Sequence, residues 1–312
     1  MTTTSQPPPT LPARPRYKRR GPRWANRLAI GGALLLVLGP LLVLWVRMEI
    51  GAWHAARGQD AVWGEQWEDA IAHYDQALAW DAEQPHYYVL RSNANLELGQ
   101  MDAALADAQR AFDLSSGRGY AASVYATTLL RAGRAREAAA IYEEWLAQVG
   151  TDQEPLRAAL ANGIAMMLAT GNIELDRALE RVQSALKHSQ QRKYARETPM
   201  YLDTRAMVYY RQGKFTEALA DMNEVLRSPG QLKHTIEVEV GNSSVDDRHR
   251  AYQLHREMYP LAQMHYHRAL VYQALAAAAK NDTDLRKAHL MAAVLDRRQV
   301  RQLGYTPDAS LF

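Results

Sequence analysis

The chain has 312 residues, 47% of them hydrophobic and 23% charged, which is an ordinary composition for a folded protein. It contains no cysteine, which excludes disulfides, thiolate metal ligands and cysteine nucleophiles. Residues 1–47 hold eight Lys or Arg and no Asp or Glu, which leaves a net charge of −5 on residues 48–312 with His counted as neutral. Because a nucleic-acid-binding face must be basic, we expect no nucleic-acid partner for this mildly acidic body.

The first 46 residues have the composition of a tail followed by a membrane anchor. Residues 1–27 begin with a Thr-, Ser- and Pro-rich segment that buries too little apolar surface to fold, so we predict a disordered basic tail. Residues 28–46 then run for nineteen positions without a charge, roughly 28 Å as a helix, which is about the thickness of the hydrocarbon core of a bilayer. We therefore predict a transmembrane helix at 28–46. The alternatives are a buried core helix, which seldom runs so far without a polar side chain, and a signal peptide, for which no good cleavage site follows.

The flanking charges predict how this helix is oriented. Seven basic residues precede it, whereas Arg47 and Arg57 just after it are offset by Glu49 and Asp60. The positive-inside rule then places the N-terminus in the cytoplasm and the rest of the chain on the other side of the membrane. We expect a single-pass membrane protein whose main domain is extracytoplasmic, facing the periplasm if the membrane is a bacterial inner membrane, or otherwise a lumen.

From residue 51 the sequence repeats with a period of 34. Ala70, Ala104 and Ala138 are each 34 residues apart, and Gly99 and Gly133 follow the same spacing. Small side chains allow two antiparallel helices to approach closely, and glycine allows the tight turn between them. Since one helix pair cannot bury its apolar face alone, successive pairs must stack. The sequence therefore predicts an all-α solenoid over residues 47–312.

This pattern resembles the tetratricopeptide repeat (TPR) family, in which bulky, small and aromatic residues alternate with a turn glycine along a helix-turn-helix unit. The clearest copy carries Leu202, Ala206, Tyr209, Gly213, Phe215, Ala218 and Leu219 where the motif expects them. The resemblance implies repeats at about 51–84, 85–118, 119–152, 157–190, 199–232 and 260–300. The fourth copy has a lengthened turn and the sixth lacks the turn glycine.

Residues 227–259 do not fit a repeat. Thr235 to Val240 alternates as a strand would, between turn-forming residues on both sides. An extended surface loop or distorted helix is one interpretation, and a partner-contacting insertion is the other. Four histidines gather nearby, but their spacing does not give the same-face pair that a helical zinc site prefers, so we expect no metal and no cofactor. These are His249, His255, His265 and His267.

No motif of a catalytic site is found, so we predict no catalytic residue and do not expect an enzyme. The chaperone-binding members of the TPR family clamp a C-terminal carboxylate with Lys and Asn side chains. The matching positions hold Ala55, Gln59, Val89 and Tyr120, and Asn93 alone fits, so that activity is not carried over.

Together with the predicted transmembrane helix, the resemblance implies a membrane-tethered scaffold that binds a protein or peptide in the concave groove of its inner helices. The alternatives are an assembly factor that acts through the transmembrane helix and an enzyme with a site in residues 227–267. The candidate groove residues, all at inner-helix positions, are His86, Asn93, Glu97, Tyr120, Ser123, Thr127, Arg131, Asp203, Met207, Tyr210 and Arg211.

Overall fold

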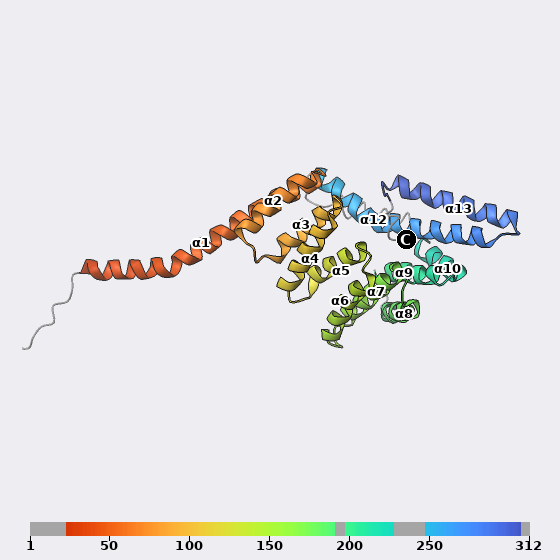
Figure 1. Cartoon of the computed structure of the whole chain (residues 1–312), viewed down its shortest axis with the longest axis horizontal. Helices are drawn as coiled ribbons and strands as arrows, with labels where there is room; N and C mark the ends of the chain where they lie inside the picture. Colours follow the sequence, from red (N-terminus) through yellow and green to blue (C-terminus); the bar gives the residue numbers. More distant parts are fainter. Residues whose placement is uncertain (1–22, 191–196, 228–246, 307–312) are drawn as a thin grey trace, which may run out of the picture. The chain divides into compact units, whose positions relative to one another are not determined.

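The computed structural model describes residues 23–190, 197–227 and 247–306, with their side chains at residue 36 and over 38–189, 197–227 and 258–306 (Figure 1). All regular elements in these ranges are helices, so the predicted all-α class is confirmed there. They are α1 (Arg23–Trp63), α2 (Trp67–Trp80), α3 (Pro85–Glu97), α4 (Met101–Leu114), α5 (Gly119–Arg131), α6 (Ala135–Gln148), α7 (Glu154–Thr170), α8 (Leu175–Gln190), α9 (Thr198–Arg211), α10 (Phe215–Val225), α12 (Asp247–Ala278) and α13 (Thr283–Gln302).

The chain divides into two compact units, residues 1–49 and 50–312, and α1 begins in the first and ends in the second. Helix α1 contains the residues 28–46 for which a transmembrane helix is predicted. In the part of the chain that the structure describes, however, no helix has an apolar stretch long enough to cross a membrane.

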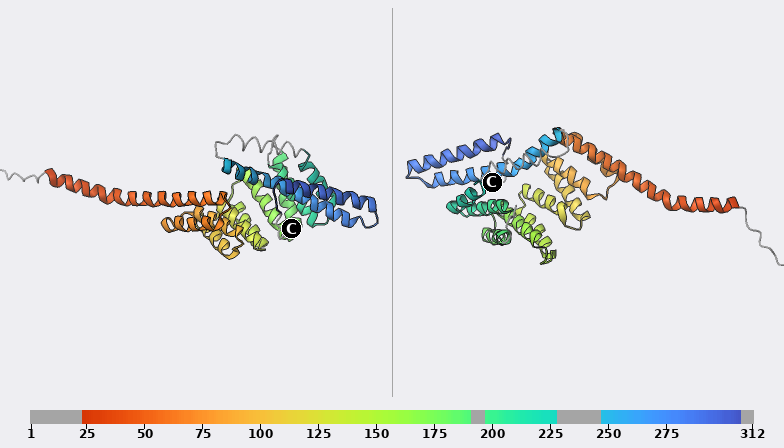
Figure 2. Two further views of the ribbon diagram at one scale, coloured as in Figure 1. Left: turned by 90° about the horizontal axis from the view of Figure 1, so that it is seen from above. Right: turned by 180° about the vertical axis from the view of Figure 1, so that it is seen from behind.

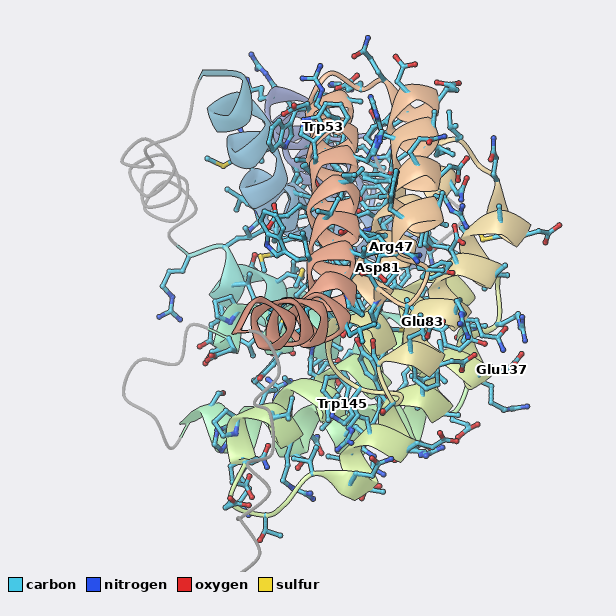
Figure 3. All side chains as sticks on the ribbon, turned by 90° about the vertical axis from the view of Figure 1, so that its left-hand side faces the viewer. Arg47, Trp53, Asp81, Glu83, Glu137 and Trp145 are labelled. Atoms are coloured by element: carbon cyan, nitrogen blue, oxygen red, sulfur yellow. The ribbon has the colours of Figure 1, made fainter. Side chains whose placement is uncertain are left out.

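The second unit is a series of antiparallel helix pairs. From α2 onward each described helix packs against the next one along the chain, and α3 also contacts α5, as α7 contacts α9. Contacts between the first helices of successive pairs are the mark of a stacked solenoid. Exposed charged side chains form ion pairs at the turns: Glu83, between α2 and α3, pairs with Arg110 at 3.2 Å, and Glu137 pairs with Arg134, just before α6, at 2.6 Å (Figure 3).

The small residues of the repeat lie where two helices meet. Ala70, Ala104 and Ala138 are all fully buried, in keeping with the close approach of paired helices. Gly99 and Gly133 have φ values of +70° and +75°, which favour glycine because a side chain would be strained there. The period of 34 thus corresponds to one helix pair and its turns.

The last helix pair departs from the expected pattern. Helix α12 already begins at Asp247 and runs for 32 residues through Pro260, so the end of the predicted insertion 227–259 is helical. The strand-like residues 235–240 lie outside the described residues, and that prediction stays a prediction.

A buried ionic cluster joins α12 to α13, which lie side by side in both views of Figure 2. The Nδ1 atom of His265 lies 2.7 Å from Oδ1 of Asp296, and Arg268 donates to both carboxylate oxygens at 2.8 Å. Burial raises the pKa of Asp296, but the hydrogen bonds from Arg268 and His265 outweigh it and hold that pKa below its ordinary value. His265 is therefore a buried side chain that pairs with Asp296. This arrangement does not test the prediction that the chain binds no metal.

Candidate functional site

A cavity of about 520 Å³ opens among the first helices of the second unit. We call it the α1–α5 cavity, because the end of α1 and the helices α2, α3 and α5 form its wall. Its volume is within the range of pockets that bind small ligands or side chains of a peptide. It is lined by Gln59, Val62, Trp63, Trp67, Tyr74, Leu90, Asn93, Ala94, Leu96, Glu97, Tyr120, Thr127 and Arg131.

Two rows of equivalent repeat positions run across this cavity. Gln59, Asn93 and Thr127 are each 34 residues apart and form the first row. The second row has the same spacing and consists of Trp63, Glu97 and Arg131. Stacked repeats place equivalent positions side by side, so the period of the sequence produces a polar row beside a row of one aromatic and two charged side chains.

The charged residues of the second row remain accessible to solvent. The Arg131 guanidinium lies 4.0 Å from the Glu97 carboxylate, with side chains 31% and 50% exposed. Exposed ion pairs of this length contribute at most about 1 kcal/mol to stability. This ion pair therefore adds little stability, and both side chains are exposed enough to meet a ligand.

Aromatic side chains line the same space. Trp63 and Trp67 are half-buried and come from the two helices of the first pair, whereas Tyr120 on α5 is 65% exposed. Aromatic rings offer a large, rigid apolar surface at low entropic cost, which is why they are frequent at binding surfaces.

The structure brings five of the predicted groove residues into this cavity, namely Asn93, Glu97, Tyr120, Thr127 and Arg131. His86 lies exposed at the start of α3 and is not part of the lining. Ser123 forms a hydrogen bond with the hydroxyl of Tyr142 on α6, where burial raises the pKa of Tyr142 and this bond lowers it in part. Ser123 therefore makes a contact within its own helix pair.

The predicted groove residues of the fifth repeat lie elsewhere and make packing contacts. Asp203 Oδ1 lies 2.8 Å from His267 Nδ1, and Asp203 and Met207 line a space of only about 20 Å³, roughly that of one water molecule. Arg211 donates to the carbonyl oxygens of Ala169 and Thr170 at 3.2 and 3.3 Å, at the end of α7.

Tyr210 packs on Phe215 with ring centroids 5.8 Å apart, so it too contacts a neighbouring helix.

Eight of the thirteen lining residues were not among the predicted ones, including Gln59, Trp63 and Trp67. The sequence contains a signal for the first two, because they lie 34 residues before Asn93 and Glu97. The first helix pair departs from the motif, since Arg57 stands where the motif has an apolar residue.

No family model matches the sequence, and no curated protein matches it. Among solved structures, the apo form of RapI is similar over 81% of this chain and 99% of its own, with 14% identity and a TM-score of 0.51. The fold is a TPR-like solenoid. A tetratricopeptide repeat protein from Parabacteroides merdae covers 78% of this chain and 84% of its own, at 14% identity and a TM-score of 0.48. MamA from Desulfovibrio magneticus covers 57% and 93%, at 14% identity and a TM-score of 0.45.

Proposed function

We propose that the chain is a protein-interaction scaffold that binds an extended peptide segment of a partner in the α1–α5 cavity. The observation that carries this proposal is the pair of rows, one polar and one aromatic and charged, on the wall of a 520 Å³ space. An extended peptide has unpaired backbone N–H and C=O groups on both sides. The amides of Gln59 and Asn93 and the hydroxyl of Thr127 can donate to and accept from such groups.

The second row fits the side chains of the same peptide. Trp63, with Trp67 and Tyr120 near it, offers apolar faces to one large side chain. Glu97 and Arg131 together offer one charge of each sign, so a peptide with a polar or charged residue next to an apolar anchor is the ligand that these positions favour.

This proposal predicts a loss of affinity on truncation of the cavity wall. Trp63→Ala and Arg131→Ala are each expected to weaken binding of the co-purifying partner by on the order of 1–3 kcal/mol, as interface anchors do. The partner is first identified by co-purification of the full chain from solubilised membranes and mass spectrometry, and affinities are then measured by titration calorimetry.

The matched control is Met200→Ala on α9, which removes a 45% exposed side chain at an inner-helix position of the fifth repeat, outside the cavity. Unchanged affinity in both cavity variants, or a loss in Met200→Ala alone, would reject the cavity as the binding site. Replacing residues 28–46 by an unrelated apolar helix tests the alternative of an assembly factor: loss of the partner in that variant alone would favour it.

We further propose that residues 28–46 of α1 tether the chain to a membrane. Leu41 to Trp45 are five consecutive large apolar side chains, each between 56% and 60% exposed, and Leu36 is 80% exposed. Water around so many adjacent apolar groups is unfavourable by roughly 25 cal/mol per Å², which a lipid environment removes. The charge asymmetry of the sequence supports a cytoplasmic N-terminus.

Protease accessibility tests this tether and its orientation. In bacterial spheroplasts that express the full chain with an epitope tag at the N-terminus, added protease is expected to digest residues 50–312 and spare the tag. Lysed spheroplasts are the control in which both are digested. Full protection of residues 50–312 in intact spheroplasts would exclude the proposed orientation, and release of the uncleaved chain by alkaline carbonate would exclude the tether.

A further inference from the structure

Helix α13 presents apolar side chains on the face opposite to its contact with α12. Leu290, Met291, Val294 and Leu295 are 44%, 64%, 60% and 59% exposed, and we call them the α13 patch. Their spacing of i, i+1, i+4 and i+5 puts them on one face over two turns of helix. The buried residues of α13 are Ala293, Asp296 and Val300, on the other side.

Such clustering is exceptional on the described solenoid. On α2 to α10, large exposed apolar side chains occur singly, at most one on each helix: Trp80, Tyr120, Met166 and Met200. In a solenoid, a helix face that no neighbouring helix covers is normally polar. Four adjacent apolar residues there indicate a surface that another molecule covers.

Charges mark the two ends of the patch. Lys287 lies one turn before Met291 and Arg298 one turn after Val294, so both share its face, and both are exposed. The carboxylate of Asp296, in the same stretch, is buried and bonded to Arg268 and His265. Asp284, one turn before Lys287, is also exposed on this side of the helix. Between Lys287 and Arg298 the face is apolar with one cation at each end, and this stretch is complementary to an apolar segment with a carboxylate at each end.

A second copy of the chain fits this face poorly. An antiparallel pairing that matches Leu290 with Leu295 and Met291 with Val294 of the copy would also bring Lys287 against Arg298. A parallel pairing would bring each of these cations near its own equivalent. Both arrangements place like charges at the two ends of the contact.

A membrane surface also fits less well than a crossing helix. A helix that lies in the interface buries its apolar face along its length, with basic residues on the polar side. Here Lys287 and Arg298 lie in line with the apolar residues and would be drawn toward the acyl chains. Two helices packed at an angle, in contrast, touch over about two turns, which is the length of the patch.

We propose that the α13 patch binds an amphipathic helix of a partner protein, with aliphatic residues over two turns and Asp or Glu at both ends. This site is independent of the α1–α5 cavity, since none of its residues lines that cavity.

Fluorescence anisotropy with designed peptides tests the proposal on the full-length protein. The probe is a labelled helical peptide with a two-turn leucine face and Glu at both ends, and its counterpart has Lys in place of Glu. We expect the Glu peptide to bind at least about ten-fold more tightly than the Lys peptide. The double variant Met291→Gln/Val294→Gln is expected to lower this affinity about ten-fold, and Lys287→Glu/Arg298→Glu to reverse the preference between the peptides.

The control variant is Met166→Gln, at a singly exposed methionine of α7, which should bind as the unmodified chain does. Thermal melts confirm that each variant is folded. Equal affinity for both peptides, or binding unchanged in Met291→Gln/Val294→Gln, overturns the proposal. Two further results would also overturn it: binding to phosphatidylglycerol vesicles that falls in that double variant while the peptides do not bind, and a dimer in sedimentation analysis that the double variant dissociates.

Discussion

Replacing Asp107 with alanine is expected to lower the free energy of unfolding by about 3 kcal/mol, because it removes the buried partner of Arg91. Asp107 accepts from Nε and from one terminal nitrogen of Arg91 at 2.8 and 2.6 Å, and Asn95 donates to it at 3.2 Å. Its side chain is only 8% exposed, against 25% for Arg91. This hydrogen bonding raises the pKa of Arg91. When Asp107 is lost the guanidinium still stays charged, because an arginine side chain is not deprotonated in proteins.

The chain contains a matched control for this experiment. Arg91 also pairs with Asp75 on α2, whose side chain is 52% exposed. Asp75→Ala is expected to cost less than about 1 kcal/mol, as is typical of solvent-exposed pairs. Urea denaturation followed by circular dichroism gives both values. Equal losses in the two variants would show that burial does not determine the strength of this pair.

A second large effect is expected on acidification, through Asp296. Because hydrogen bonds from Arg268 and His265 hold the pKa of Asp296 below its ordinary value against the effect of burial, the unfolded chain binds the proton more readily. The stabilisation is therefore complete above about pH 4, the ordinary range of an aspartate, and is lost as the pH falls through the lower pKa of the folded state. Asp296→Asn is expected to cost about 3 kcal/mol at neutral pH, because it breaks a buried pair with Arg268.

The pH dependence separates this ionic contribution from packing. Below pH 4 the stability of the unmodified chain should fall more steeply than that of Asp296→Asn, so the difference between them narrows. Urea denaturation between pH 7 and pH 3 measures this difference. Asp284→Asn, at an exposed position of the same helix, is the control and should follow the unmodified chain. Parallel curves for Asp296→Asn and the unmodified chain would contradict the assigned role.

The helix pairs could be predicted from sequence because their signal is local and periodic. Ala70, Ala104 and Ala138 mark the tight helix contacts, and the turn glycines lie at fixed distances from them. The five cavity residues of the second and third repeats follow from the same register. The same spacing also applies to Gln59 and Trp63, but these two residues were not predicted because the first helix pair departs from the motif.

Other contacts join residues that are far apart in the chain, and the repeat period does not predict such pairs. Asp203 meets His267, 64 residues later, and Arg211 reaches the end of α7 across more than 40 residues. Asp203 and Arg211 thus make long-range contacts that the repeat period does not reveal. The α13 patch was likewise not predicted, since the sixth repeat is degenerate and its outward face could not be distinguished from its inward face by the motif.

The ionic contacts of Arg91 limit how far the repeats can be treated as modules. This side chain, on α3, holds one carboxylate in its own helix pair and another in the preceding one. The fifth repeat contains the same internal pair, Arg205 with Asp221, whereas the third has Tyr125 and Ile141 at these positions.

A chimera that moves the third repeat directly behind the first would therefore set Tyr125 beside Asp75 and leave that carboxylate without its cation. Recombining repeats at the period of 34 residues therefore preserves these ion pairs only if the order of the repeats is also preserved. Neighbouring repeats are matched in charge as well as in shape. A rearranged array would keep the spacing of 34 residues but would lose ion pairs between its repeats.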